Sequence, residues 1–316
     1  MIDLSNNLKE TANCYIISEE GNYEFPLVYG CGFMNGKENP RSYAGDNFLD
    51  YNGEIINTPE IPYKIKEAKI ISWDSDPEIK DIKIKENYLK FSITKVPEGG
   101  ANYVIAIFDD QEKIIWSWHL WLWSDDLKDV RIGNYTFLNI PLASRLEDEK
   151  LNIWFYQWGR KDPMCYLDNN NIVKRSTNTM EAIQNPNTLY YNAGGNWNWI
   201  DNSNYWGKEK TIYDPCPAGY RVPGKEALVN ITECESYKKD SIKGEIKFNN
   251  DLLIPLSGIK YSDGIFYKDI RGVFWCNEVE ERQCGSALAL HFCKCNVITS
   301  YMKTEAVGII PQKYDD

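Results

Sequence analysis

The chain has 316 residues, of which 43% are hydrophobic and 26% charged, so it is globular and long enough to form two ordinary domains. Its formal net charge of −11 argues against a nucleic-acid partner, and its Lys and Arg residues are scattered without a run that would hold an anionic membrane. No stretch approaches the roughly 18 apolar residues that a membrane-spanning helix needs.

The N-terminal part of the chain is predicted to form short β-strands. Residues 12–18 and 23–29 are rich in β-branched and aromatic side chains, and residues 19–22 between them have a turn composition. Residues 35–62 are rich in Gly, Asn, Pro and charge and are expected to form a long surface loop. Further strands are predicted at residues 68–73, 79–85, 88–94, 103–108 and 113–123. Strands of this length and spacing indicate an antiparallel β-sandwich.

One of these strands, residues 114–123, is apolar on both of its alternating faces. One face holds Trp116 and Trp118, and the other holds Trp121 and Trp123. A strand that is apolar on both faces must be covered on both. We therefore expect it to lie between the N-terminal sandwich and a second domain.

The second half of the chain mixes helical and strand patterns. The Asn-rich residues 168–204 are predicted to contain a short helix at 179–184, and residues 224–239 have apolar residues at helical spacing. Asp263 and Gly264 form a hairpin signal of the type I′ kind. Strands are predicted at residues 135–143, 244–248, 252–256, 258–261, 265–268, 287–292 and 305–310. This mixture predicts an α+β domain.

Residues 205–223 form the most distinctive stretch of the chain. Pro215, Pro217 and Pro223 each fix a backbone φ angle and remove a hydrogen-bond donor, and Gly219 permits conformations that other residues resist. The stretch therefore cannot form the middle of a helix or a central strand. It is predicted to be a rigid loop.

Within this loop the sequence Tyr-Asp-Pro-Cys-Pro-Ala-Gly-Tyr-Arg-Val-Pro resembles the signature of the Fibrobacter succinogenes major paralogous domain family. The resemblance covers most of the chain and departs from the family pattern at residues 137–143, 274–276 and 309–311. Further stretches that resemble the family are residues 11–18, 23–26, 104–106, 115–119, 156–163, 274–275, 287–292 and 306–308.

The resemblance implies an exported protein of Bacteroidetes-type bacteria with a C-type-lectin-like fold. On that basis we expect a β-sandwich at residues 1–130 and a C-type-lectin-like α+β domain at residues 131–316. The expected function is that of a non-catalytic binding or adhesion protein, located at the cell surface or associated with fimbriae. No signal peptide is visible at the start of the chain, so the alternative is a cytosolic protein.

A ligand site is predicted in residues 190–202, where glycines hold two indole rings beside several amides. Tryptophan rings stack on sugar rings, and amides hydrogen-bond hydroxyl groups. This chemistry suits a glycan, and the family resemblance implies a glycan or a neighbouring surface protein as the partner. In the alternative interpretation, both indoles cover the core beneath a loop. The predicted ligand-binding residues are Trp197, Trp199, Asn196, Asn198 and Tyr191.

The cysteine and histidine residues indicate a metal site or a catalytic site only weakly. The nine Cys are an odd number and include no CxxC pair, so a zinc ribbon is not expected. His291, Cys293 and Cys295 alternate on one strand face but converge poorly on one ion, and His119 is expected to be a core residue. No metal, cofactor or catalytic residue is predicted. The alternatives to a binding protein are a purely structural surface subunit and a thiol-dependent oxidase of the sulfatase-modifying type.

Overall fold

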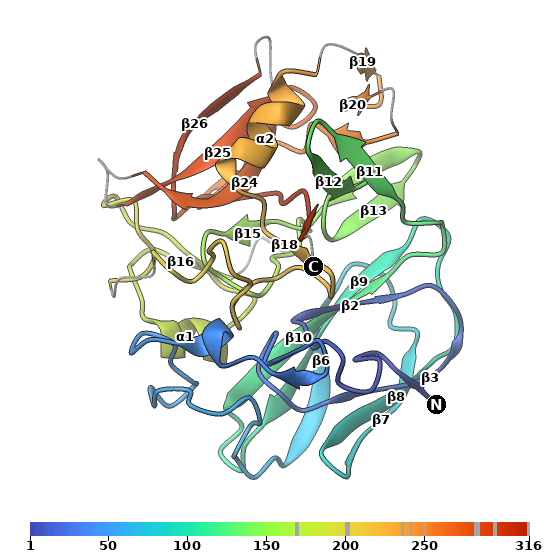
Figure 1. Cartoon of the computed structure of the whole chain (residues 1–316), viewed down its shortest axis with the longest axis vertical. Helices are drawn as coiled ribbons and strands as arrows, with labels where there is room; N and C mark the ends of the chain where they lie inside the picture. Colours follow the sequence, from blue (N-terminus) through green and yellow to red (C-terminus); the bar gives the residue numbers. More distant parts are fainter. Residues whose placement is uncertain are drawn as a thin grey trace.

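The computed structural model describes residues 1–167, 171–199, 203–234, 237–240, 242–248, 251–280, 285–292 and 296–314 (Figure 1). Over these residues the protein is mostly β, with several small sheets, two short α-helices and one 3₁₀ helix. The predicted class, all-β combined with α+β, is confirmed. None of the helices in the described ranges is long and apolar enough to cross a membrane.

Two four-stranded sheets form the N-terminal, sandwich-like part of the molecule. The strand order of the first sheet is β1 (Ile2–Asp3), β3 (Gly21–Pro26), β8 (Tyr88–Ile93) and β7 (Ile79–Lys85). The strand order of the second sheet is β2 (Cys14–Ile17), β10 (Ile114–Leu122), β9 (Ala101–Phe108) and β6 (Glu67–Trp73). The predicted strands are found within a few residues of their expected bounds. The pairing is antiparallel except at two sheet edges, where β1 runs parallel to β3 and β2 runs parallel to β10.

Strand β10 is covered on both faces, as its sequence predicts. The ring of Trp118 lies 5.1 Å from that of Phe25 in the first sheet, inside the sandwich core. On the other face, Trp121 belongs to a second core with residues from the C-terminal half, and its Nε1 donates to the carbonyl oxygen of Ser144 (2.9 Å). The strand therefore joins two hydrophobic cores.

The prediction that residues 35–62 are a surface loop is wrong in part. The segment contains β5 (Lys37–Glu38), paired with β4 (Phe33–Met34), and the 3₁₀ helix η1 (Pro40–Tyr43). Most of its aromatic and aliphatic side chains are buried in the sandwich core, because burial of apolar surface is favourable, although Ile55 is 50% exposed. Phe48 stacks on Tyr213 at 5.5 Å. The Gly and Pro content of the segment sets its irregular backbone and does not determine its exposure.

The C-terminal half is built from several small sheets, which lie in the upper part of Figure 1. One four-stranded sheet has the strand order β11 (Asp129–Ile132), β12 (Tyr135–Leu138), β28 (Gln312–Lys313) and β18 (Tyr220–Arg221). A second four-stranded sheet has the strand order β15 (Tyr156–Gln157), β27 (Ala306–Val307), β22 (Ile259–Tyr261) and β23 (Gly264–Phe266). Two three-stranded sheets have the orders β24 (Gly272–Val279), β25 (Ser286–Phe292), β26 (Val297–Met302) and β19 (Tyr237–Asp240), β20 (Glu245–Phe248), β21 (Leu253–Pro255). Paired strands are β13 (Ser144–Glu147) with β14 (Lys150–Ile153), and β16 (Ile172–Val173) with β17 (Leu189–Tyr190).

The two α-helices differ in how well the sequence predicts their ends. Helix α1 (Thr179–Gln184) has the predicted bounds, and its N-cap Asn178 accepts the backbone N–H of Glu181 at 2.8 Å. Helix α2 (Lys225–Thr232) ends seven residues before the predicted limit of 239, and residues 237–240 form β19 instead. The reason is that the buried stripe stops at Ile231, so a longer helix would gain no burial.

The predicted hairpin at residues 258–268 is present as β22 and β23. Tyr261 pairs with Gly264, so Ser262 and Asp263 form the turn, one residue earlier than predicted. Neither residue has the positive φ that a type I′ turn requires, so the predicted turn type is wrong. Gly264 has a φ of 136°, a value that residues with a side chain rarely adopt. The glycine is therefore required at the first position after the turn.

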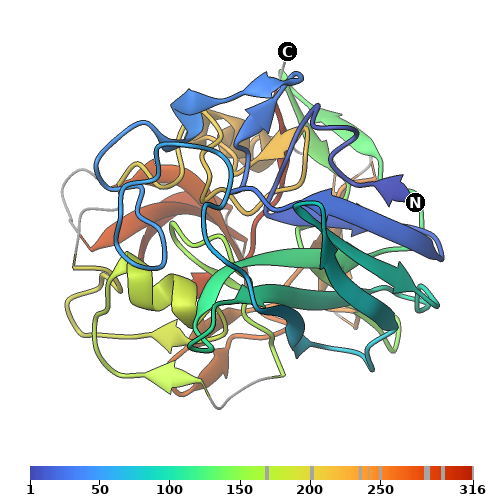
Figure 2. The same cartoon turned by 90° about the horizontal axis from the view of Figure 1, so that it is seen from below.

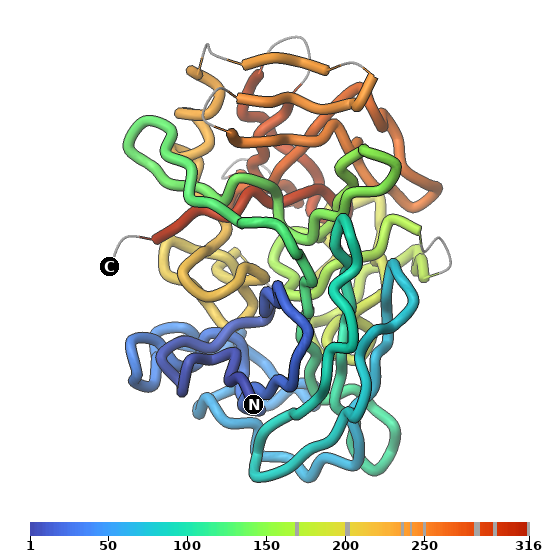
Figure 3. Tube along the Cα trace, turned by 90° about the vertical axis from the view of Figure 1, so that its right-hand side faces the viewer, coloured from blue at the N-terminus to red at the C-terminus, as the bar shows by residue number. Residues whose placement is uncertain are grey.

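Buried side chains connect the two halves of the chain. The sandwich core includes Tyr190, Trp197, Tyr205 and Tyr213, which follow residue 130 in sequence, while Cys14 belongs to the second core. Figure 3 shows the N-terminal strands and the C-terminal strands at opposite ends of the molecule, with residues near 200–220 between them. The expected units, residues 1–130 and 131–316, therefore share their hydrophobic interior.

Candidate functional site

The signature loop, residues 205–223, is mostly buried, with exposed positions such as Lys208 and Glu209. The side chain of Asn13, beside β2, donates from Nδ2 to the carbonyl oxygens of Ile212 (2.7 Å) and Asp214 (2.9 Å). The Asp214 carboxylate, 1% exposed, accepts two backbone N–H groups of the same loop, at 2.8 and 3.0 Å. The acid of the signature therefore fixes the turn.

Lys210 ties the same loop to both ends of the chain. Its Nζ, on a side chain that is 1% exposed, donates to the carbonyl oxygen of Pro217 (2.6 Å) and lies 3.4 Å from a carboxylate oxygen of Glu10. The Glu10 carboxylate also accepts the N–H of Gly219 at 3.0 Å and the hydroxyl of Tyr314. These charges satisfy one another, which leaves none directed at a ligand.

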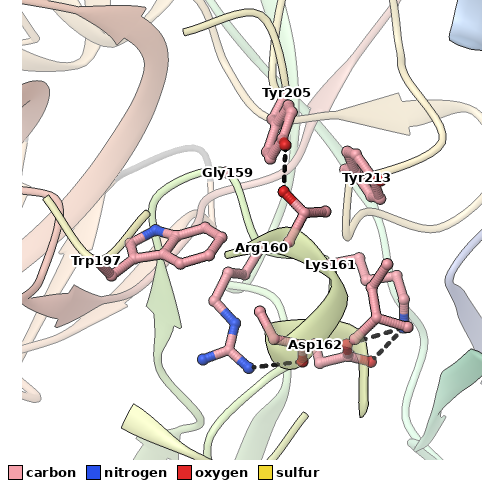
Figure 4. Close-up of a pocket in the computed structure, with 10 residues that line it drawn as sticks. Gly159, Arg160, Lys161, Asp162, Trp197, Tyr205 and Tyr213 are labelled. Atoms are coloured by element: carbon pink, nitrogen blue, oxygen red, sulfur yellow. Dashed lines mark hydrogen bonds and ion pairs between the residues drawn. The ribbon is translucent and has the colours of Figure 1, made fainter. Parts of the chain in front are cut away.

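Arg160 is a buried cation that binds backbone carbonyl groups. It is 4% exposed, and its guanidinium lies 5.6 Å from the ring of Tyr190 and 5.7 Å from that of Trp197. The carbonyls come from the last part of α1 and the turn after it, where helical carbonyls lack intrahelical partners. Figure 4 shows the side chain beside the helix. The acceptors are the carbonyl oxygens of Ala182 (3.3 Å), Asn185 (3.1 Å), Pro186 (3.0 Å) and Thr188, and Oε1 of Gln157 (3.0 Å).

Lys161 and Asp162 form a buried ion pair next to Arg160. Nζ of Lys161 lies 2.8 Å from both carboxylate oxygens of Asp162 and donates to Oγ and the carbonyl oxygen of Ser117 at 2.7 and 2.9 Å. The ammonium also lies 4.3 Å from the ring of Trp116. Burial lowers the pKa of Lys161 to about 8, and the Asp162 charge opposes that change. The pair thus anchors the turn that follows β15 to strand β10.

A small cavity lies between this turn, helix α1 and the rings of Trp197 and Tyr205 (Figure 4). Its volume is about 20 Å³, which is room for a single water molecule. The charged groups around it are already hydrogen-bonded to protein atoms. This cluster is therefore a packing centre, and it offers no space for a ligand.

Two of the five predicted ligand-binding residues lie inside the protein. Trp197 is 1% exposed, and its Nε1 donates to the carbonyl oxygen of Trp158 at 2.8 Å. Asn198 is also 1% exposed, and its Nδ2 donates to Oγ1 of Thr179 at 3.0 Å. Asn198 thus holds the Asn-rich segment onto α1, and Trp197 holds it to the turn that follows β15. A ligand does not reach either side chain in this structure.

The other three predicted residues lie at or near the surface. The indole of Trp199 is 68% exposed, and its backbone N–H donates to the carbonyl oxygen of Thr177 at 3.1 Å. Asn196 and Tyr191 are half-buried. The structure therefore separates the two predicted rings, because one faces the core and one faces solvent. Residues 200–202 of the predicted stretch lie outside the described residues.

His119 is a core residue, as predicted. It is 1% exposed, its Nε2 is 2.9 Å from Oδ1 of Asn102, and its ring stacks on that of Trp154. Burial lowers the pKa of His119 to about 3, so the imidazole is neutral at ordinary pH. Without access to solvent, it cannot exchange protons with a substrate.

Five of the six described cysteines are shielded from solvent as well, and Cys234 is half-buried. Burial raises the pKa of Cys31 and Cys276 to about 12, and Cys14 and Cys216 shift in the same direction for the same reason. A thiol with a raised pKa is a poor nucleophile at neutral pH. Within the described ranges, no group of three or more His, Cys, Asp and Glu residues is placed to hold a metal ion. Cys284, Cys293 and Cys295 lie outside those ranges.

A wide groove of about 1020 Å³ opens beside helix α2, and we call it the α2 groove. Clefts of this order of size accept small molecules and short oligomers. It brings together side chains from five separate segments of the chain. Its lining includes Asn134, Tyr135, Lys208, Arg221, Lys225, Glu226, Asn230, Asn277, Glu278 and Gln312.

Side chains of the α2 groove are only partly engaged by protein atoms. The hydroxyl of Tyr135 donates to Oε2 of Glu226 at 3.2 Å, and Oε1 of Glu278 accepts the backbone N–H of Lys225 at 2.9 Å. Nε of Arg221 is buried and has no hydrogen-bond partner among the described residues, although Nη1 donates to a carbonyl oxygen. The groove thus presents cations, carboxylates and amides around an open volume.

Sequence reasoning missed the α2 groove, although Lys208 and Arg221 of its lining lie in the signature loop. The other lining segments are separated from one another by tens of residues, and no pattern in the sequence predicts that they meet. Comparison of the chain with family models, with curated proteins and with solved structures finds no match.

Proposed function

We propose that this protein is a non-catalytic binding protein of the exported, cell-surface or fimbria-associated class, and that a glycan occupies the α2 groove. The observation that carries the proposal is the groove itself, with about 1020 Å³ bordered by amide, hydroxyl and charged side chains. Sugars are recognised by such groups, which donate to and accept from hydroxyls. The resemblance of the signature loop supports the exported class.

The burial and protonation states of His119 and four of the cysteines favour binding over catalysis by these groups. His119 is neutral and sealed in the core, and the thiols of Cys14, Cys31, Cys216 and Cys276 are buried with raised pKa values. Acid–base and nucleophilic catalysis both need an accessible group with a pKa near the working pH. A thiol-dependent oxidase built on these four cysteines is therefore disfavoured.

A structural surface subunit is the second candidate function. It is favoured by the internal use of these charged residues, because Lys210, Asp214 and Arg160 satisfy backbone groups. Lys210 also pairs with Glu10 in the N-terminal part of the chain. In that case the α2 groove would contact a neighbouring subunit.

A glycan array on the purified chain, followed by titration of each positive glycan, tests the proposal. The groove variant carries Lys225→Gln and Asn230→Ala, two changes at α2 that leave the buried stripe intact. The loop variant Trp199→Ala removes the exposed indole of the predicted site. We expect glycan binding to fall at least tenfold in the groove variant and to persist in the loop variant.

The opposite pattern, with binding lost only in Trp199→Ala, would place the ligand on the Asn- and Trp-rich loop. If no glycan binds at any concentration, the structural subunit becomes the better description. Equal melting temperatures of the three proteins are required as a control.

A further inference from the structure

A second pocket, separate from the α2 groove, lies under the segment of residues 50–63. Its volume is about 200 Å³, and its wall combines carboxylates with tyrosine rings. Two tyrosines line the pocket: Tyr29, which lies between β3 and β4 in the chain, and Tyr63, at the C-terminal end of the segment. The pocket residues used below are Tyr29, Asp50, Glu54, Glu60 and Tyr63.

The hydroxyl of Tyr29 is the unusual group in this pocket. Tyr29 is 2% exposed, and its Oη is buried without a hydrogen-bond partner among the described residues. Leaving a buried hydroxyl without a hydrogen-bond partner is unfavourable. Burial, followed by the nearby charge of Asp50, raises its pKa, so the group remains a neutral phenol. An occupant that donates to this oxygen would remove the cost.

The charges around the pocket have one sign. Asp50, Glu54 and Glu60 line it, and no Lys or Arg belongs to its described lining. Asp50 is 3% exposed, with Oδ1 accepting the backbone N–H groups of Asn52 (2.8 Å) and Glu54 (3.0 Å) and Oδ2 accepting the hydroxyl of Tyr63. Its position is therefore fixed, and the pocket has a negative potential.

The spacing of these groups favours an organic cation over a metal ion. The described carboxylates are not gathered closely enough for three of them to ligate one metal. The oxygens of Asp50 are already hydrogen-bonded, and the volume exceeds what a bare ion fills. Tyrosine faces beside carboxylates attract ammonium and guanidinium groups through cation–π and Coulomb interactions.

We propose that this pocket binds an organic cation, either a primary ammonium or a guanidinium group, that donates a hydrogen bond to Oη of Tyr29 and lies between the carboxylates of Glu54 and Glu60. The cation comes either from a free amine or from a Lys or Arg side chain of another protein. The site is independent of the proposed glycan groove, since the two share no residue.

The test is calorimetric titration of the full chain with butylamine, butylguanidine and the neutral control n-butanol. Two capped peptides, whose single charge is a Lys or an Arg side chain, represent the protein source. The variants are Tyr29→Phe, Glu54→Gln and Glu60→Gln, with Glu98→Gln, an exposed carboxylate outside the pocket, as the matched control. Melting temperatures show that each variant is folded.

We expect saturable binding of the cations and none of butanol. Tyr29→Phe should weaken binding about fivefold through the lost hydrogen bond, without loss of melting temperature, because the substitution removes an unpaired hydroxyl. Glu54→Gln and Glu60→Gln should each weaken it about threefold at low salt, and Glu98→Gln should leave it unchanged. Binding of the peptides alone assigns the cation to a protein partner, and binding of the amines assigns it to a free ligand.

The proposal is overturned if no cation saturates the site, if butanol binds equally well, or if the three pocket variants bind like Glu98→Gln. Tyr29→Phe also separates the binding role from a structural one. A structural hydroxyl would lower the melting temperature when removed and leave the cation affinity of the folded protein unchanged.

Discussion

The buried cluster beside α1 and the α2 groove contain similar charged side chains but differ in what surrounds those charges. In the cluster, Arg160, Lys161 and Asp162 are 3–4% exposed, and protein atoms occupy their hydrogen-bonding positions. In the groove, Lys208 and Lys225 are exposed beside an open volume. A cluster of charged side chains therefore indicates a binding site only where protein atoms do not already occupy the hydrogen-bonding positions of those side chains. Figure 2 shows α1 and its surroundings from below.

The largest effect that tests this comparison is expected for Arg160→Met. The substitution leaves several buried carbonyl groups at the end of α1 without a donor, so the free energy of unfolding should fall by about 5 kcal/mol. Arg175→Met is the matched control, because Arg175 pairs with Glu181 of the same helix but is 54% exposed. Its removal should cost less than about 1 kcal/mol. Denaturant unfolding measures both values, and equal losses would contradict a special role for the buried cation.

A double-mutant cycle on Lys161 and Asp162 should give the next largest effect. Lys161→Met or Asp162→Asn alone leaves the partner buried without its counter-charge and should cost about 3–4 kcal/mol. The double variant should cost clearly less than the sum of the two, because no unpaired charge remains. Urea unfolding of the four proteins at pH 7 gives the coupling energy. Strict additivity would mean that the two side chains stabilise the turn independently.

Because His119 is buried in its neutral form, we expect the free energy of unfolding to fall as the pH is lowered. Its folded-state pKa of about 3 lies below the unfolded value of 6.5, so the unfolded chain binds the extra proton as the pH falls below 6.5. The contribution is about 1.4 kcal/mol per pH unit, or about 2 kcal/mol between pH 6.5 and 5. We expect His119→Gln to show a shallower decline over this range in denaturant titrations. An unchanged slope would show that other groups govern acid unfolding.

Glu305 predicts a slope of the opposite sign. It is 9% exposed, Oε2 has no hydrogen-bond partner among the described residues, and burial raises its pKa from 4.5 to about 7. The folded state holds its proton longer than the unfolded state, so stability falls as the pH rises from 4.5 to 7. Glu305→Gln should remove about 1.4 kcal/mol of this fall between pH 5 and 6. Denaturant titrations over the same pH series measure this effect. A steeper fall of stability with pH in Glu305→Gln than in the unmodified protein would contradict a raised pKa of Glu305.

The smallest stability effect is expected in the α2 groove. Lys225→Gln and Asn230→Ala change exposed or half-buried side chains of α2, and each should alter the free energy of unfolding by less than about 0.5 kcal/mol. Thermal unfolding of the single variants checks this. A loss comparable to that of Arg160→Met would mean that the groove charges are structural as well, and the contrast between the two regions would disappear.

Part of the site was accessible from the sequence. The prolines of the signature loop predict a rigid loop, and the structure adds that Asp214 and Lys210 hold this loop in place through hydrogen bonds. The split between Trp197 and Trp199 was not accessible, because both indoles occur in the same Gly- and Asn-rich composition. Only the tertiary fold, which places Trp158 behind Trp197, separates the ring in the core from the ring in solvent.

The sequence by itself determined the β-rich class, the approximate bounds of the N-terminal strands other than β1, β4 and β5, the bounds of α1 and the need to cover β10 on both faces. These features depend on local periodicity, caps and turn residues. Tertiary structure alone decided which charges became internal, how far α2 extends and where the groove opens. Burial and cavities arise from contacts between segments such as residue 135 and residue 278, which no local pattern encodes.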